Sequence, residues 1–366
     1  FTVDMSLKRI APGLGVTGKA LARELGLPLH APKRRRLEDQ GVSQERLDDA
    51  GEHLLSHRGA TLKYYIFAAL ALFGLVFMLR LGRPDLAVRS ERKLWYPRAP
   101  HVAVLLISII ACGFALGKSP NPMEGTVKLF KAMVGLYPSV AGKAVAFGFF
   151  MSLAVIGNKL VCGWACPFGA LQELIYSLPM LRSAKRMRPP FWLSNTVRSG
   201  LFCVMLLLLF GIVGDRRGFV LYHSLNPFNL FDLHLEDRLI IATVVAALAG
   251  SFVMYRPFCQ WICPFGLASW LGERLSLARV TIDRASCTEC GSCVQACPSG
   301  AAKGILDGSR FAADCFSCGR CLSRCPGDAI RYGWVFGKRG PAPARAEDRL
   351  TKGGILAMAN NGNQLQ

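Results

Sequence analysis

The stretches Cys287-Thr-Glu-Cys290-Gly-Ser-Cys293-Val-Gln-Ala-Cys297-Pro298 and Cys315-Phe-Ser-Cys318-Gly-Arg-Cys321-Leu-Ser-Arg-Cys325-Pro326 decide the fold of this chain. Both have the spacing C-x2-C-x2-C-x3-C-P, in which three thiolates hold one cubane iron–sulfur cluster and the fourth ligates the neighbouring cluster. This spacing predicts two [4Fe-4S] clusters. The expected ligands are Cys287, Cys290, Cys293 and Cys325 for cluster one, and Cys315, Cys318, Cys321 and Cys297 for cluster two. A zinc site would require only two C-x2-C pairs and neither proline.

Two more cysteine pairs lie upstream, and each is followed by proline. Cys162 and Cys166 form the first C-x3-C-P motif, and Cys259 and Cys263 form the second. The i, i+4 spacing predicts that both sulfurs of a pair lie on one face of a helix end, so that two half-sites could make one whole site. The four thiols could hold a further iron–sulfur cluster, bind a soft metal such as copper(I), or act as a redox-active dithiol pair.

The fourteen cysteines favour metal ligation over disulfide bonds. Twelve of them lie in the four tight motifs that end in Cys-Pro, whereas a secreted disulfide framework spreads its cysteines through a short chain. The two others, Cys112 and Cys203, lie inside apolar runs, and we expect them to be small apolar fillers.

Five apolar runs, nearly free of charge, precede the double motif: Tyr64–Leu79, His101–Gly117, Ala144–Asn158, Ser199–Gly214 and Leu239–Tyr255. Each is slightly shorter than the about 20 residues that cross a bilayer core. Basic side chains at their ends can snorkel and extend the spans, namely Lys63, Arg80, Lys143, Lys159 and Arg256. The pattern predicts an α-helical integral membrane protein with about five transmembrane helices, followed by a small α+β ferredoxin domain of the bacterial 2[4Fe-4S] type.

The membrane part contains an internal repeat. Each copy has a helix, a polar loop with an Asn-Pro pair and a second helix that ends in a C-x3-C-P motif; the copies run from about 101 to 172 and from about 199 to 271. The Asn-Pro pairs are Asn121-Pro122 and Asn226-Pro227. Because both copies have the same membrane orientation, a parallel two-helix repeat is expected.

The formal net charge of +20 admits nucleic acid or an anionic membrane surface as the partner. The hydrophobic content of 52% favours the membrane. The basic run 33–36 is followed by Glu38 and Asp39, which is typical of a solvated face, so no nucleic acid is expected. Nucleotide binding is not expected either, because the G-x-G-x-x-G sequence at 13–18 follows a proline and lacks the flanking strand of a phosphate loop.

The chain divides into four predicted parts. Residues 1–61 form a small helical module of unknown function, 62–275 the transmembrane domain, 276–333 the ferredoxin domain and 334–366 a disordered tail. The loops on the C-terminal side of the spans carry slightly more Lys and Arg, which places that side in the cytoplasm. A reducing cytoplasm also suits thiolates that must hold iron.

The two C-x3-C-P motifs combined with the double [4Fe-4S] segment resemble the membrane ferredoxin family of NapH, MauN and the carboxy-terminal half of NosR. The stretch Cys162-Gly-Trp-Ala-Cys166-Pro-Phe-Gly-Ala-Leu-Gln-Glu173 is most similar to the NosR version. The resemblance covers about residues 100–333. It implies a protein of the bacterial inner membrane that passes electrons between the quinone pool or a cytoplasmic donor and a respiratory reductase, which could be periplasmic.

Two classes of function remain open at this point. The first is an electron-transfer component of a respiratory chain, with redox proteins as partners, rather than a stand-alone enzyme. The second is an assembly or regulatory factor that delivers a metal or reduces a disulfide through the C-x3-C-P cysteines. Membrane transport has little support, because none of the five runs contains a central ionisable residue. A quinone or a b-haem could use His101, His223 or His234 at the outer surface, although anchoring at the interface explains these histidines better.

Overall fold

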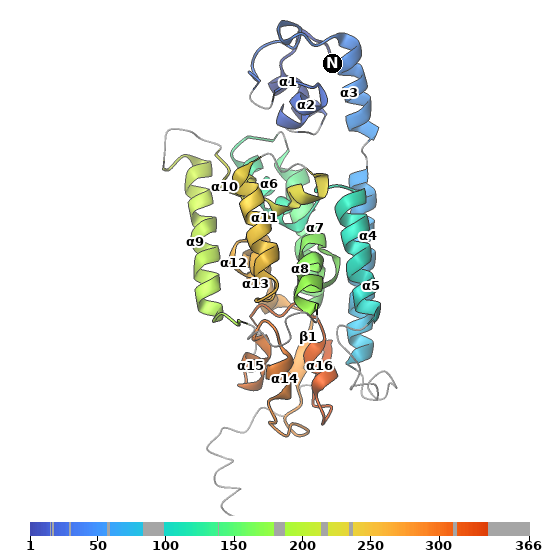
Figure 1. Cartoon of the computed structure of the whole chain (residues 1–366), viewed down its shortest axis with the longest axis vertical. Coiled ribbons are helices and arrows are strands. Elements are labelled where there is room, and N and C mark those ends of the chain that lie inside the picture. Colours follow the sequence, from blue (N-terminus) through green and yellow to red (C-terminus); the bar gives the residue numbers. More distant parts are fainter. Residues whose placement is uncertain are drawn as a thin grey trace, which may run out of the picture.

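The computed structural model describes residues 1–14, 16, 18–28, 31–56, 59–82, 99–137, 139–178, 187–213, 219–233, 237–309 and 313–335. Beyond Val335, the predicted tail lies outside the described residues. Helices make up most of the described chain, and its two polar parts lie at opposite ends of a bundle of apolar helices (Figure 1).

The polar amino-terminal module contains α1 (Leu7–Gly13), α2 (Gly18–Glu24), η1 (Glu38–Gln40) and α3 (Gln44–Ser56). Apolar side chains from the three α-helices and from the segments between them share one small core, which includes Leu7, Leu21, Leu37 and Leu47. The Gln44 side chain ties the chain terminus to α3, because its amide donates to the Phe1 carbonyl oxygen at 2.9 Å.

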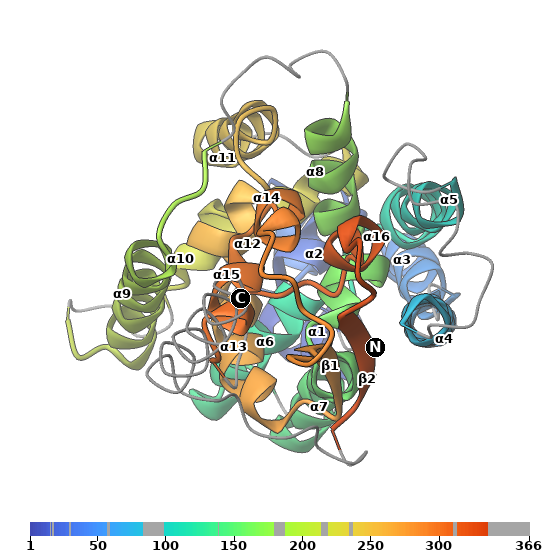
Figure 2. The same ribbon diagram turned by 90° about the horizontal axis from the view of Figure 1, so that it is seen from below.

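The apolar bundle runs from α4 to η7. Its first half contains α4 (Gly59–Leu81), α5 (Ala99–Ile107) with its continuation η3 (Ser108–Ala115), α6 (Pro122–Met133), α7 (Val140–Gly157), η4 (Val161–Ala165) and α8 (Pro167–Ser177). Its second half contains α9 (Phe191–Phe210), α10 (Leu221–Ser224), η6 (Pro227–Asp232), α11 (Arg238–Gly250), α12 (Pro257–Trp261), α13 (Pro264–Gly272) and η7 (Glu273–Leu275). Seen from the ferredoxin end, the long helices lie around the short helices α12 and α13 (Figure 2).

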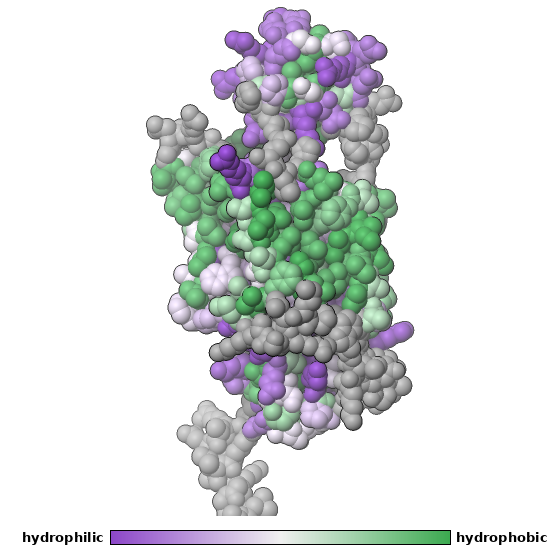
Figure 3. Space-filling view, in the orientation of Figure 1, coloured by the Kyte–Doolittle hydropathy of each residue, from purple (hydrophilic) through white to green (hydrophobic). Residues whose placement is uncertain are grey.

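Three described helices are long and apolar enough to cross a membrane: 62–81 in α4, 140–157 in α7 and 191–210 in α9. Two shorter apolar helices, 99–115 and 238–250, lie in the same bundle. The face shown in Figure 3 is apolar over this bundle and polar at both ends, which is the surface that a membrane protein presents. Crossing by the two shorter helices stays a prediction.

The prediction of snorkelling side chains is wrong for three of the five flanking residues. Lys63, Lys159 and Arg256 are 0% exposed and point into the protein. Each has an internal polar partner: Lys63 donates to the Gly117 carbonyl oxygen, Lys159 pairs with Glu273 at 3.1 Å and Arg256 pairs with Glu173 at 3.1 Å. Because each of these charged side chains already has a polar partner inside the fold, it does not need to reach the membrane surface.

The fourth apolar run also differs from its prediction. Helix α9 begins at Phe191, directly after Pro190, and not at Ser199, so it contains Arg198. Arg198 is 0% exposed and donates to Asn195 Oδ1 at 2.7 Å and to Asp314 Oδ1 at 3.3 Å. A candidate span therefore does hold an ionisable residue, contrary to the prediction, and it faces the inside of the protein.

The carboxy-terminal part is a small α+β unit. Strand β1 (Ala278–Ile282) pairs antiparallel with β2 (Ile330–Trp334), with Val280 opposite Tyr332. Between the strands lie α14 (Ser292–Ala296), α15 (Ala301–Leu306) and α16 (Arg320–Arg324). Val280, Ile330 and Tyr332 are buried on one face of the pair, which fixes the register because strand side chains alternate between faces.

Candidate metal centres

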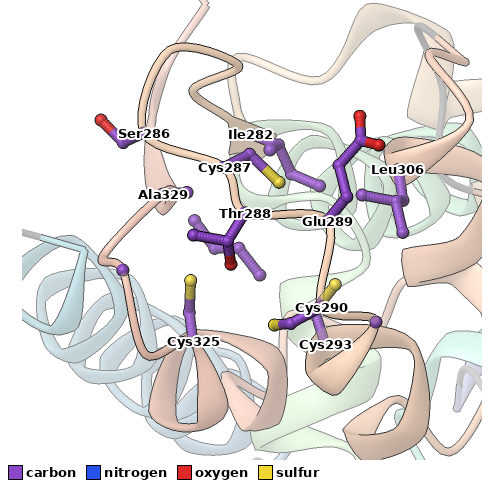
Figure 4. A pocket seen from close by; sticks show the side chains of 13 residues that line it. Ile282, Ser286, Cys287, Thr288, Glu289, Cys290, Cys293, Leu306, Cys325 and Ala329 are labelled. Atoms are coloured by element: carbon purple, nitrogen blue, oxygen red, sulfur yellow. The ribbon is translucent and has the colours of Figure 1, made fainter. Parts of the chain in front are cut away.

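The double motif folds into two pockets, and each pocket contains four cysteines. Cys287, Cys290, Cys293 and Cys325 line the first (Figure 4). Cys297, Cys315, Cys318 and Cys321 line the second. The structure thus brings together the residues that the sequence assigns to each cluster, including the fourth cysteine from the other motif.

Local backbone geometry explains this exchange. Cys297 ends α14 and Cys325 ends α16, and both leave the helix in the extended conformation, with ψ of 112° and 115°. Proline follows each of them and prevents the helix from continuing. In both motifs the glycine after the second cysteine has positive φ, +70° at Gly291 and +80° at Gly319, a conformation that glycine adopts without strain.

The two pockets differ in their access to solvent. Cys290 is exposed, and hydrogen bonding to Ser292 lowers the pKa of its thiol. In the second pocket, burial raises the pKa of the Cys315 thiol and raises that of Cys318 to about 11. Four converging sulfur atoms are soft donors of the kind that fit an iron–sulfur cluster.

The two C-x3-C-P motifs converge inside the apolar bundle. Cys162, Cys166 and Cys259 are 8% exposed, and the three other cysteines of the motifs lie near Cys162. Gln172 of α8 links the two motifs, because its amide donates to Cys259 Sγ at 3.4 Å and accepts from the Phe258 N–H at 3.0 Å. We call Cys162, Cys166, Cys259 and Cys263 the central four-cysteine site.

Each pair spans a break between two short helices and does not lie on one continuous helix face as predicted. Cys166 is the N-cap of α8 and Cys263 is the N-cap of α13. Both have extended backbones, with ψ of 116° and 119°, and proline occupies the first helical position after each. The proline ends the preceding helix and begins the next one, which rotates the second cysteine of each pair.

None of the fourteen cysteines forms a disulfide bond. Among the residues that the structure describes, no three His, Cys, Asp or Glu side chains lie close enough together to hold a single metal ion.

The central site borders the second pocket directly. A Cβ on Gly163 would lie 2.1 Å from the Phe316 carbonyl oxygen, and the Trp164 indole N–H donates to the Ser317 carbonyl oxygen at 3.0 Å. Phe316 and Ser317 lie between Cys315 and Cys318. The backbone of the first C-x3-C-P motif therefore packs on the loop that would hold cluster two.

Replacing Gly163 by alanine is expected to loosen this contact, because the new methyl group would clash with a backbone oxygen that cannot turn away. Hydrogen exchange should increase around Ser317, and the melting temperature should fall. Gly148→Ala in α7 is the matched control, since a Cβ there meets nothing within 4 Å. Equal exchange in both variants would contradict the close packing.

Buried ion pairs, which the sequence reading missed, hold the ferredoxin segment on the bundle. Lys159 pairs with Asp314, and Arg320 pairs with Glu173 at 2.5 Å. Burial raises the pKa of the Glu173 carboxyl, but Arg320 and Arg256 outweigh it and bring the pKa down to about 2. One signal was available in the sequence: a basic residue, Lys159 or Arg256, stands three positions before the first cysteine of each pair.

One of the three histidines predicted at the outer surface is placed differently. His101 does not lie at the outer surface, because it is 1% exposed and packs against Trp164, with ring centroids 4.4 Å apart and ring planes tilted by 38°, beside the ferredoxin segment. His223 is exposed, and His234 lies outside the described residues.

Comparisons with known proteins agree with these centres. A family model described as a 4Fe-4S binding domain matches residues 144–189 and 239–280, which hold the two C-x3-C-P motifs. A second model, described as a 4Fe-4S dicluster domain, matches residues 279–326. The chain is NapH/MauN/NosR-like, a membrane protein with 4Fe-4S ferredoxin domains. The predicted resemblance is confirmed.

Three curated relatives illustrate the likeness. This membrane ferredoxin is 24% identical over 205 residues to the methylamine utilization ferredoxin-type protein MauN of Methylobacillus flagellatus, which covers 54% of the chain and 69% of MauN. It is 28% identical over 167 residues to the ferredoxin-type protein NapH of Haemophilus influenzae, covering 44% of the chain and 53% of NapH. It is 30% identical over 154 residues to the regulatory protein NosR of Pseudomonas aeruginosa, covering 40% of the chain and 21% of NosR.

The chain thus spans about half the length of NapH and about a fifth of NosR. No solved structure gives a significant match.

Proposed function

We propose that this membrane ferredoxin carries single electrons between a donor at its ferredoxin segment and the membrane, as a component that links a quinone pool or cytoplasmic donor to a respiratory reductase. The observation that carries the proposal is the contact of Gly163 and Trp164 with Phe316 and Ser317. Clusters held by Cys287, Cys290, Cys293 and Cys325, and by Cys315, Cys318, Cys321 and Cys297, supply the one-electron chemistry.

The residues around the pockets support a path for electrons along the molecule, from the ferredoxin segment to the apolar bundle. The first pocket includes Cys290, which is exposed and therefore accessible to a soluble partner. The second pocket is next to the bundle, since Ser317 donates to the Gly157 carbonyl oxygen at 2.7 Å and Tyr332 donates to the same oxygen at 2.9 Å. The pockets and the central four-cysteine site therefore follow one another from solvent toward the membrane.

Five membrane crossings complete the proposal. Each of the five apolar helices exposes a large apolar side chain that suits lipid; examples are Leu72, Ile110, Val145, Val204 and Val245. An odd number of crossings puts the amino-terminal module in the periplasm and the ferredoxin segment in the cytoplasm, the side on which thiols stay reduced. The parallel repeat is supported by the match of one family model to both copies and by Asn121 and Asn226, which both act as N-caps.

Reporter fusions test the crossings. A fusion of alkaline phosphatase to residue 60 is expected to be active, because that enzyme folds only after export, and a fusion after Val335 is expected to be inactive. A cytoplasmic reporter such as β-galactosidase should give the reverse pattern. Phosphatase activity after Val335 would place the ferredoxin segment outside and contradict the proposed route.

A rapid-mixing experiment tests the function itself. Protein in nanodiscs is reduced with dithionite, freed of reductant and mixed with a short-chain quinone, which takes two electrons and two protons to form quinol. The iron–sulfur absorption is expected to return as the clusters lose one electron each, and Gly163→Ala should slow this return more than Gly148→Ala does. Clusters that stay reduced in the presence of quinone would argue against the quinone link.

The relative NosR is named a regulatory protein, which favours an assembly or regulatory factor as the second candidate. In that case the four central thiols would deliver a metal or reduce a disulfide in a partner. Release of bound metal to an acceptor protein, without reoxidation of the ferredoxin clusters by quinone, would support this candidate over electron transfer.

A further inference from the structure

We propose that four lysines, at the end of the bundle next to the amino-terminal module, bind the headgroup of an anionic phospholipid. They are Lys19, Lys33, Lys131 and Lys143, and we call them the lysine cluster. This end of the bundle, where α6 lies, is opposite the ferredoxin segment (Figure 1). The inference therefore goes beyond the proposed electron transfer and does not depend on it.

Two lysines of the bundle share one aromatic ring. Lys131, near the end of α6, has its ammonium nitrogen 5.2 Å from the centre of the Tyr137 ring. Lys143, in the first turn of α7, has its nitrogen 4.9 Å from the same centre. The face of an aromatic ring attracts cations, so Tyr137 holds two positive charges close together.

The amino-terminal module brings two more positive charges to the same place. Lys19 lies in the first turn of α2, and the stem of Lys33 packs on that turn, since a Cβ on Gly18 would lie 3.6 Å from Lys33 Cδ. Burial lowers the pKa of Lys131, and the charges of Lys128, Lys19 and Lys33 lower it further. Cations of the module and of the bundle therefore face one another.

The nearby carboxylates already have other cations as partners. Glu124 pairs with Lys128 at 2.7 Å, and Asp232 pairs with Lys118 at 3.3 Å. Among the residues that the structure describes, the lysine cluster forms no ion pair with a carboxylate. Like charges at close range repel one another, so an anion that binds among them is stabilised.

The surface beside the cluster is apolar, which selects a lipid as the source of the anion. Large apolar side chains are exposed from the end of α6 to the first turns of α7, namely Met133, Leu136, Val140 and Val145. Helix α7 is also one of the three that are long and apolar enough to cross a membrane. Acyl chains can cover these side chains while the phosphate of the same molecule accepts hydrogen bonds from the ammonium groups. Tyr137 suits this boundary, because tyrosine is enriched where a membrane meets water.

A headgroup at this position joins two parts of the chain. Lys19 and Lys33 belong to the module, and Lys131 and Lys143 belong to the bundle. One phosphate between them replaces the repulsion of the two sets of cations by attraction of both to the same anion. The bound lipid therefore holds the module against the bundle.

Lipid competition tests the ligand. The full chain in mild detergent receives equal amounts of phosphatidylglycerol, which is anionic, and phosphatidylcholine, which is not, and native mass spectrometry identifies the bound lipid. We expect a preference for phosphatidylglycerol. Lys131→Gln and Lys143→Gln should each weaken the binding of this lipid by about fivefold, the effect of one basic residue beside an anionic headgroup.

Two variants control for the change of side chain. Lys131→Arg keeps the positive charge and should keep the preference. Lys303→Gln removes an exposed lysine of α15, at the other end of the molecule, and should not alter it. The EPR signals of the ferredoxin clusters report whether each variant is folded, because these clusters lie far from the lysines.

Hydrogen exchange in nanodiscs tests where the lipid binds. Nanodiscs of phosphatidylglycerol are expected to protect the backbone around Lys33 and Tyr137 more than nanodiscs of phosphatidylcholine do, and Lys131→Gln should lose this difference.

Three results would overturn the proposal. The first is equal binding of the two lipids by the wild type, and the second is an unchanged preference in Lys131→Gln. The third is protection of the same segments by inorganic phosphate in lipid-free detergent, which would assign the lysine cluster to a free anion.

Discussion

Cys297→Ser is expected to remove the cluster built on Cys315, Cys318 and Cys321 and to leave the cluster of its own motif in place. The reason is geometric, because Cys297 leaves α14 in the extended conformation and lines the pocket of the other three. Iron analysis and low-temperature EPR of the dithionite-reduced protein measure the effect. We expect a loss of about four of the about eight irons in the double motif.

Cys325→Ser is the mirror variant and should remove the cluster of Cys287, Cys290 and Cys293. Cys203→Ser controls for the loss of any cysteine. If Cys297→Ser gives the same spectrum as Cys287→Ser, the crossed ligation is wrong.

Lys159→Met is expected to destabilise the protein by about 3–5 kcal/mol, the range found when one partner of a buried ion pair is removed. Lys159 is 0% exposed, and its ammonium group pairs with both Glu273 and Asp314. Arg198 still reaches Asp314 in the variant, but Glu273 loses its cation. Thermal unfolding and hydrogen exchange at the junction of bundle and ferredoxin segment measure the loss.

Lys303→Met, at an exposed lysine of α15, is the matched control and should have little effect. Adding Glu273→Gln to Lys159→Met should recover part of the stability, because the unpaired carboxylate is then gone. A Lys159→Met protein as stable as Lys303→Met would show that the buried pair does not hold the two parts together.

Much of the iron–sulfur chemistry could be predicted from the sequence, because cluster ligands are specified by spacing over a few residues. The four cysteines of each double-motif pocket were assigned from spacing alone, and the pockets contain those residues. The apolar runs likewise marked the long helices of the bundle. The predicted helix ends are less accurate where a proline sets them. Pro190 is the N-cap of α9, so this helix begins at Phe191 and not at Ser199.

Two of the errors concern charges. The sequence predicts that Lys159 and Arg256 snorkel and that no run holds a central ionisable residue, whereas both side chains are buried and α9 includes Arg198. A charged residue at the end of an apolar run gives the same sequence pattern whether its side chain faces lipid headgroups or an internal carboxylate. Only the position of Glu173, Glu273 and Asp314, far away in the sequence, distinguishes the two cases.

The sequence by itself determined which cysteines share each pocket of the double motif, the apolar nature of the bundle and the resemblance to NapH, MauN and NosR, because each depends on residues close together in the chain. Only the tertiary structure decided that Cys162 and Cys259, with their neighbours, form one buried site, and that it lies against the loop of Phe316. The physical reason is that burial and charge balance depend on which distant segments pack together, and local spacing carries no information about that packing.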